Sequence, residues 1–212
     1  VAAVATAVTA TFTPVAPVQE ADAQTRCPAV AFIAARGSGQ NDKIYPTQYS
    51  NQGGRASNGW EAESIRMMLQ NTEARYQATH GGNSVMKDVY VLGLEPKYYP
   101  ATNPEYTVPN VALPTTAAQV LGLVLQYAQP VIGTAVSAVD QFSHSVETGR
   151  RGVMSAINDY EAGTGCHPQY ILSGFSQGAM VIANHEAELA LRGQLAGVVT
   201  FGDLLTRRND PS

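Results

Sequence analysis

The residues most able to do chemistry lie in one pentapeptide, Gly174-Phe175-Ser176-Gln177-Gly178, which occurs once in the 212-residue sequence. A G-x-S-x-G pattern is typical of a nucleophilic serine on a sharp turn between a strand and a helix. The flanks fit that setting, because an apolar run precedes the pentapeptide and an alanine-rich stretch follows it. The pattern predicts that Ser176 attacks a carbonyl group. The alternative is a Gly-rich turn that carries an ordinary capping serine.

Such a serine needs hydrogen-bond donors for the negative oxygen that forms on the attacked carbonyl. One donor in this kind of turn is the backbone N–H of the residue after the nucleophile, here Gln177. The second must come from another loop. The tetrapeptide Arg36-Gly37-Ser38-Gly39 directly follows an apolar run, at the same expected edge of the sheet. Ser38 could offer its hydroxyl and its N–H there, although this tetrapeptide is also typical of a plain turn.

The elements that must position these residues are visible as short apolar runs. Their β-branched and aromatic content, without strict alternation, is typical of parallel strands covered on both faces. We expect these strands at Ala29 to Ala34, Asp88 to Leu94, Gln169 to Phe175 and Gly197 to Phe201. Helical spacing is expected over Asn58 to Thr79, Val153 to Tyr160 and Ala179 to Leu191. Strands alternating with helices predict a three-layer α/β domain with a central, mostly parallel sheet.

The composition restricts the class of protein. With 44% hydrophobic and 14% charged residues and a formal net charge of -4, the 212 residues can bury one core and are expected to form one domain. No run of Lys or Arg is present, so we expect no nucleic acid partner. The two cysteines lack the spacing of a structural zinc site, and no phosphate-binding glycine loop is visible. We therefore expect that the protein needs no cofactor and no metal. We also expect a monomer.

One long segment does not fit the alternation of strands and helices. Residues 96–139 are rich in proline, and residues 106–139 carry no charged side chain. A membrane span would need about 20 apolar residues, but Gln126, Gln129 and Pro130 interrupt this run. We expect either a partly buried helix pair or lid over the site, or a plain part of the core.

The first 23 residues read VAAVATAVTATFTPVAPVQEADA, an Ala/Val/Thr stretch with no charge before Glu20. The stretch ends in a small-x-small pattern and resembles a secretory signal peptide, with an N-terminal strand or a tether as the alternative. We expect a signal peptide remnant over residues 1–23, a domain over residues 24–212, and secretion. In an oxidising compartment Cys27 and Cys166 would form one disulfide, and otherwise they would be two free thiols.

Three segments carry a family resemblance. They are Cys27-Pro28, Ala35-Arg36-Gly37-Ser38, and Cys166 followed closely by Gly174-Phe175-Ser176-Gln177-Gly178-Ala179. Together they resemble the cutinase family, in particular its bacterial secreted esterases, over residues 27–203. The resemblance implies an α/β-hydrolase-like fold with a Ser-Asp-His triad and Ser176 as its nucleophile. It also implies an oxyanion hole from Ser38 and Gln177, and a Cys27–Cys166 disulfide.

The histidine and the acid of such a triad are not evident in the sequence. In this fold both follow the serine, because the histidine accepts the serine proton and the acid orients the histidine. Only His185 follows Ser176, and on one continuous helix it would lie about 13 Å along the axis from the serine. His80, His144 and His167 precede the serine and are expected to be solvated surface imidazoles.

Asp203 ends the fourth expected strand and is a tempting acid. In cutinase-like sequences, however, the acid lies further on, in a disulfide-linked loop that the histidine follows. We therefore expect the triad Asp and His beyond Ser212, in a truncated sequence, with a protein that never had the triad as the alternative. As written, the 212 residues should be a poor catalyst.

Three functional hypotheses remain. The first is a secreted serine carboxylic-ester hydrolase that acts through an acyl-enzyme on lipid-like or polyester esters and can contact a lipid interface. The second is a non-catalytic lipid-binding or cell-envelope module that keeps the serine turn as scaffold. The third is an envelope acyltransferase or thioesterase.

Overall fold

The computed structural model describes residues 26–104, 117–183 and 185–202. The bounds of the elements, in chain order, are Val30–Ala35 for β1, Ala62–Thr79 for α2, Val89–Gly93 for β2, Ala117–Thr164 for α3, Gln169–Phe175 for β3, Gln177–Ile182 for α4, Glu186–Leu191 for α5 and Leu195–Phe201 for β4. All four expected strands are confirmed, with bounds shifted by at most two residues.

The four strands form one parallel sheet in the order β2-β1-β3-β4. β1 is central, since Val30 is in register with Val89 of β2 on one side and with Gln169 of β3 on the other. The chain therefore first adds a strand on one side of β1 and then continues on the other side. In open α/β sheets, ligands bind outside the carboxyl ends of the strands at such a reversal. The segments that follow β1 and β3 lie at this position.

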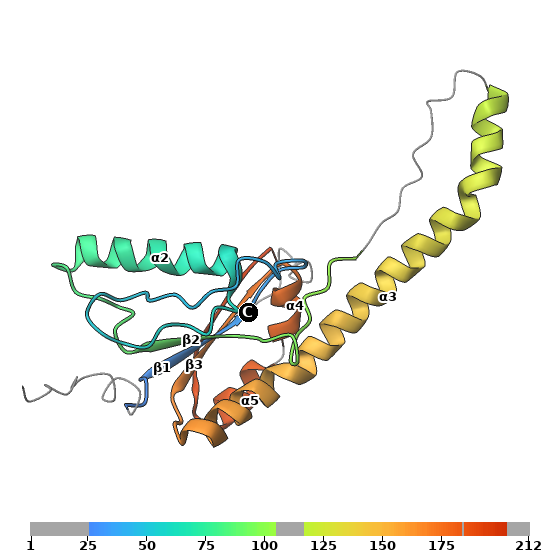
Figure 1. The fold of residues 1–212 in the computed structure, drawn as a ribbon. Coiled ribbons are helices and arrows are strands. Elements are labelled where there is room, and N and C mark those ends of the chain that lie inside the picture. Colours follow the sequence, from blue (N-terminus) through green and yellow to red (C-terminus); the bar gives the residue numbers. More distant parts are fainter. Residues whose placement is uncertain (1–25, 105–116, 184, 203–212) are drawn as a thin grey trace, which may run out of the picture.

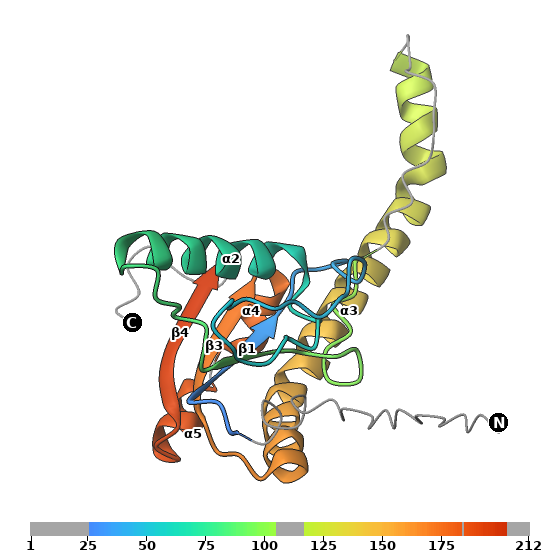
Figure 2. The ribbon, with the colours of Figure 1, turned by 60° about the vertical axis from the view of Figure 1, so that its left-hand side comes forward.

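Side chains of β1 alternate between two cores, one on each face of the sheet. Ile33 packs in the larger core with Ile157 of α3 and Ile182 of α4, whereas Phe32 packs in the smaller core with Ile65 of α2. Figures 1 and 2 show α2 over one face and the C-terminal part of α3, with α4 and α5, over the other. The predicted three-layer α/β architecture with a parallel sheet is confirmed.

β4 differs from the other strands in its burial. Val198 and Val199 are 38% and 42% exposed. Because successive side chains of a strand point to opposite faces, neither face of β4 is fully covered by described residues. Within the described residues, the expectation that all four strands are covered on both faces is therefore not met for β4. β2, at the other edge of the sheet, is buried, so sequence pattern gives the apolar character of a strand but not which edge strand is covered.

The segment over residues 96–139 also differs from expectation. Instead of a helix pair, α3 is one helix of 48 residues that includes Pro130. Its first half points away from the sheet in both views rather than folding back over it, and Val136 and Val139 are 63% and 65% exposed, which is unlike a lid. Tyr99 and Ala101, which precede this helix, are fully buried in the larger core, so the alternative of core is confirmed for that part of the segment. The proline removes one backbone hydrogen bond without ending the helix. Among the described residues, no helix combines the length and apolar character needed to cross a membrane.

The helix expected over Ala179 to Leu191 is two short helices. α4 ends at Ile182, and the next residue, Ala183, has an extended backbone with φ -54° and ψ 139°. Ile182 and Leu189 are both fully buried in the larger core. The break lets both helices direct an apolar face to the sheet, a demand of tertiary packing that a run of helix-forming residues does not reveal.

A disulfide joins Cys27 to Cys166, which are 139 residues apart in the sequence, with their Cα atoms 5.4 Å apart. The predicted bridge is confirmed, and it uses both cysteines of the chain. It links the segment before β1 to the segment between α3 and β3. The bridge therefore lies at the amino ends of the strands, opposite the segments that carry Ser38 and Ser176.

Candidate active site

Ser176 lies on the turn between β3 and α4, with φ 53° and ψ -119°. A residue with a side chain rarely adopts positive φ, so the surrounding structure must hold this conformation. Gly174 and Gly178 make the turn possible. A Cβ on Gly174 would lie 2.5 Å from the backbone of α4, and a Cβ on Gly178 would overlap the carbonyl oxygen of Ala35. This is the strained strand-to-helix turn that the G-x-S-x-G pattern predicts.

The turn of Ser176 and the loop after β1 lie against each other. A Cβ on Gly37 would lie 2.7 Å from the ring of Phe175, the residue before the serine. The contact between Gly178 and Ala35 joins the same two segments from the other side of the turn. Ser38 belongs to this loop, two residues after Arg36. It therefore lies at the same edge of the sheet as Ser176, as its place after β1 predicts.

Three polar groups here have no partner among the described residues. They are the Ser176 hydroxyl, the Ser38 hydroxyl and the backbone N–H of Gln177. Gln177 is the first residue of α4, and N–H groups in the first turn of a helix have no partner within the helix. A hydroxyl and a free N–H on adjacent residues are two of the groups that attack on a carbonyl requires, because the N–H can bind the oxygen that becomes negative.

The side chain of Gln177 is fixed behind the turn, although only its backbone was expected to matter. It is fully buried, and its Oε1 accepts hydrogen bonds from the Tyr99 hydroxyl at 2.8 Å and the Ser145 hydroxyl at 3.1 Å. The Tyr99 hydroxyl also lies 2.9 Å from the carbonyl oxygen of Arg36. Burial raises the pKa of Tyr99, so this hydroxyl keeps its proton. These contacts link the serine turn to the loop after β1 and to α3.

Arg36 fixes the beginning of the loop that carries Ser38. Its guanidinium is fully buried, donates to the carbonyl oxygens of Leu94 and Tyr99, and donates to Asn41 Oδ1 at 2.6 and 2.8 Å. It also lies 5.0 Å from the centre of the Trp60 ring. Desolvation lowers the pKa of Arg36 to about 10. A buried cation bonded mainly to carbonyl oxygens makes the loop rigid, because each of those oxygens would otherwise lose its partner.

The sequence interpretation missed the positioning roles of Arg36, Tyr99 and Ser145. The signal that could have indicated Arg36 is its place directly after an apolar strand, where an arginine is expected to be buried. Tyr99 and Ser145 gave no such signal. They lie 78 and 32 residues before Gln177, and only the fold brings them to it.

The four histidines have different surroundings. His80 stacks on Tyr76 at the end of α2, and His144 is exposed on α3. His167 is 68% exposed but lies 3.1 Å from a carboxylate oxygen of Glu161, so the expectation of a purely solvated imidazole is incomplete.

His185 lies in the break between α4 and α5, so the expectation that it shares one helix with Ser176 is wrong. Its Nε2 is buried without a partner among the described residues, and burial lowers its pKa. None of the four histidines forms a hydrogen bond with Ser176 in the described structure. Asp203 lies outside the described residues.

No described group of three His, Cys, Asp or Glu residues is arranged to hold a metal ion. The candidate site therefore consists of one serine hydroxyl, the backbone N–H beside it, the neighbouring loop with Ser38, and the buried side chains that hold these segments together.

Comparison with known proteins adds little to this geometry. No family model and no curated protein matches the sequence. Among solved structures, the chain is similar to an acetylxylan esterase with 14% sequence identity and a TM-score of 0.42, over 86% of this chain and 67% of that chain. A likeness at this level identifies neither a family nor an activity for this chain. The resemblance to the cutinase family stays a prediction.

Proposed function

We propose that this protein is a serine carboxylic-ester hydrolase with Ser176 as its nucleophile. The observation that carries the proposal is the backbone of Ser176, held at φ 53° and ψ -119° between two glycines that leave no room for a Cβ. Strained backbone of this kind persists only where the surrounding structure maintains it, and it concentrates at functional sites. The turn also stands at the carboxyl ends of the strands, beside the reversal in strand order.

In the proposed reaction, Ser176 Oγ attacks the ester carbonyl carbon while its proton passes to a general base. The carbonyl oxygen becomes negative and accepts hydrogen bonds from the N–H of Gln177 and from Ser38. Collapse of this intermediate breaks the ester bond, and the alcohol leaves with a proton from the protonated base. Water then attacks the acyl-enzyme by the same steps, which releases the acid and restores the serine.

The reaction also requires a general base, and none of the four histidines of the sequence forms a hydrogen bond with Ser176. That an acid and a histidine follow Ser212 stays a prediction. For substrate class, we propose esters with an apolar acyl part, such as lipid-like or polyester esters. The sequence over residues 106–139 carries no charged residue, and Val136 and Val139 in the described part of α3 offer exposed apolar side chains to such molecules. We propose export because disulfides persist in oxidising compartments and this chain has one.

The non-catalytic lipid-binding or envelope module is the second candidate. The observation in its favour is that no described histidine forms a hydrogen bond with Ser176. An envelope acyltransferase or thioesterase would use the same serine and differ in the acceptor of the acyl group.

A fluorophosphonate probe separates the enzymes from the binding module. In the native, full-length protein, we expect stoichiometric labelling of Ser176, identified by peptide mass, and turnover of a short p-nitrophenyl ester. Ser176→Ala should lose both, whereas Ser155→Ala, a matched exposed serine on α3, should retain both. An unmodified Ser176 in folded protein would favour the binding module. Product analysis with and without an added alcohol then separates a hydrolase from an acyltransferase.

A further inference from the structure

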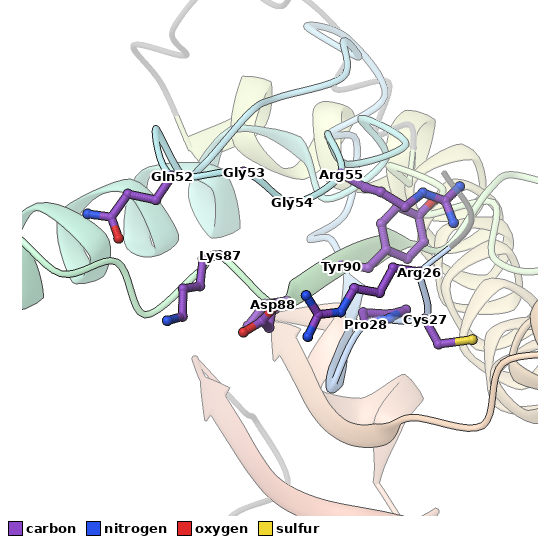
Figure 3. A pocket seen from close by; sticks show the side chains of 11 residues that line it. Arg26, Cys27, Pro28, Gln52, Gly53, Gly54, Arg55, Lys87, Asp88 and Tyr90 are labelled. Atoms are coloured by element: carbon purple, nitrogen blue, oxygen red, sulfur yellow. The ribbon is translucent and has the colours of Figure 1, made fainter. Parts of the chain in front are cut away.

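A second candidate site lies at the opposite end of the sheet from Ser176. A cavity of about 510 Å³ opens among three segments: residues 26–28 before β1, residues 52–55 in the loop before α2, and residues 87–90 at the start of β2. Figure 3 shows the loop of residues 52–55 along one side of the cavity and residues 26–28 and 87–88 along the other. All of these lie at the amino ends of the strands, so the cavity is separate from the proposed site of ester hydrolysis.

The lining of this cavity is basic, although the chain as a whole has a formal net charge of -4. Arg26, Arg55 and Lys87 supply three cations against the one carboxylate of Asp88. In the described part of the chain, none of the three cations forms an ion pair. The cavity therefore has an excess of positive charge and free N–H donors, which an anion would satisfy.

Arg55 is held in place by an aromatic side chain. Its guanidinium lies 4.6 Å from the centre of the Tyr90 ring, and Tyr90 is itself buried. Stacking on a ring fixes the plane of a guanidinium but leaves its N–H groups free at the edge. Arg55 is half-buried, so its charge is less screened by water than that of a fully exposed arginine.

Backbone contacts hold the three walls together. The carbonyl oxygen of Asp88 accepts hydrogen bonds from the N–H groups of Ala29 at 3.0 Å and Val30 at 3.3 Å. Gly54 has φ 93°, and a Cβ there would lie 2.8 Å from the carbonyl oxygen of Lys87. The disulfide at Cys27 anchors the third wall to the segment before β3. The backbone positions that carry the three cations are therefore set by the fold before any ligand binds, which reduces the entropy lost on binding.

We propose that this cavity binds a phosphate group, with Arg26, Arg55 and Lys87 as its ligands. Guanidinium groups match phosphate oxygens through paired hydrogen bonds, and the lysine adds a point charge. The excess of two positive charges corresponds to the charge of a phosphate monoester near neutral pH. A soluble phosphate ester and the headgroup of a phospholipid present the same chemistry to these side chains.

The test is a titration of the native protein with inorganic phosphate at low ionic strength, followed by NMR, with chloride of matched ionic strength as the reference. We expect saturable shifts at residues 26–28, 53–55 and 87–90. Arg26→Gln and Lys87→Gln should each weaken binding about tenfold, because each removes a charged donor. Both side chains are exposed, so these variants should fold. Arg151→Ala, which removes an exposed arginine on α3, should bind phosphate as the unmodified chain does.

A second arm distinguishes the two sources of phosphate. Vesicles of phosphatidylcholine with phosphatidic acid are compared with vesicles of phosphatidylcholine alone. Binding that requires phosphatidic acid, is displaced by inorganic phosphate and is weakened in Lys87→Gln identifies a lipid headgroup as the source. Binding of inorganic phosphate without binding to these vesicles identifies a soluble ligand. The absence of saturable phosphate binding, or binding that neither Arg26→Gln nor Lys87→Gln weakens, would overturn the proposal. None of these readouts depends on Ser176.

Discussion

The two ends of the parallel sheet are built by different means. At the carboxyl ends, the turn of Ser176 is held by close backbone packing around Gly174 and Gly178 and by buried hydrogen bonds to Gln177. At the amino ends, a disulfide joins residues 139 positions apart in the sequence, beside a cavity lined by cations. The turn has no space for an additional atom at Gly174 or Gly178, whereas the cavity has open space and cations that form no ion pair with a described residue.

The two ends of the sheet should therefore tolerate amino-acid substitutions differently. A close-packed turn loses stability when one methyl group is added, because moving backbone atoms apart costs free energy. An end held by a covalent link loses stability when the link is removed but keeps its local geometry in the molecules that fold. Each of the following predictions tests one side of this comparison, beginning with the largest effect.

Removal of the disulfide should have the largest effect on stability. Cys27→Ala with Cys166→Ala should lower the free energy of unfolding by about 4–5 kcal/mol, the value of the chain-entropy model for a loop of this length. The measurement is urea denaturation of the double variant and the parent protein. Because the bridge lies at the amino ends of the strands, the fraction that remains folded should still label at Ser176 with the fluorophosphonate probe. Loss of labelling in folded protein would show that the two ends are not independent.

Addition of one methyl group at the serine turn should have the second largest effect on stability. Gly178→Ala places a Cβ on the carbonyl oxygen of Ala35 and should cost about 3 kcal/mol of stability, together with the labelling of Ser176. Gly163→Ala is the matched control, since it lies in α3 with nothing within 4 Å of the added Cβ. The control should raise stability by about 0.5–1 kcal/mol, because alanine is the better helix former. Equal effects of the two changes in thermal unfolding would contradict the close packing of the turn.

Loss of one buried hydroxyl should have a moderate effect. Tyr99→Phe removes the single hydroxyl proton that lies within reach of both Gln177 Oε1 and the carbonyl oxygen of Arg36, and should cost about 1–2 kcal/mol. If Tyr99 positions the Gln177 N–H, the rate of labelling at Ser176 should fall as well, with the protein still folded. Tyr98→Phe is the control, because the Tyr98 hydroxyl bonds to Asp159, away from the serine turn, and is more exposed. A labelling rate equal in both variants would assign Tyr99 a purely structural role.

The smallest effect should come from His185. Burial lowers its pKa and outweighs the nearby carboxylates of Glu188 and Glu186, so the folded protein binds fewer protons than the unfolded chain. The contribution of His185 to stability is therefore full above the unfolded pKa of about 6.5 and is lost as the pH falls through the folded pKa. Denaturation between pH 7 and pH 5 should show a shallower decrease in His185→Asn than in the parent. Equal decreases in the two proteins would contradict the assignment of this pH dependence to His185.

Several features could be predicted from the sequence because they depend on local pattern. The four strands follow from short apolar runs, and the strained turn follows from the two glycines around Ser176. The place of Ser38 near this turn follows from the geometry of parallel sheets, in which the ends of all strands meet at one edge. The pairing of Cys27 with Cys166 was within reach because the chain has two cysteines.

Other features were decided by tertiary structure alone. Whether the helix after Ser176 breaks at Ala183, and whether residues 117–164 form one helix or two, depends on which surfaces are available for packing. The partners of Gln177 and the cations around the cavity come from segments distant in the sequence, so no local spacing reveals them. Local pattern fixes how a short segment folds because its cause is backbone geometry, whereas long-range contacts arise only when the whole sheet has been assembled.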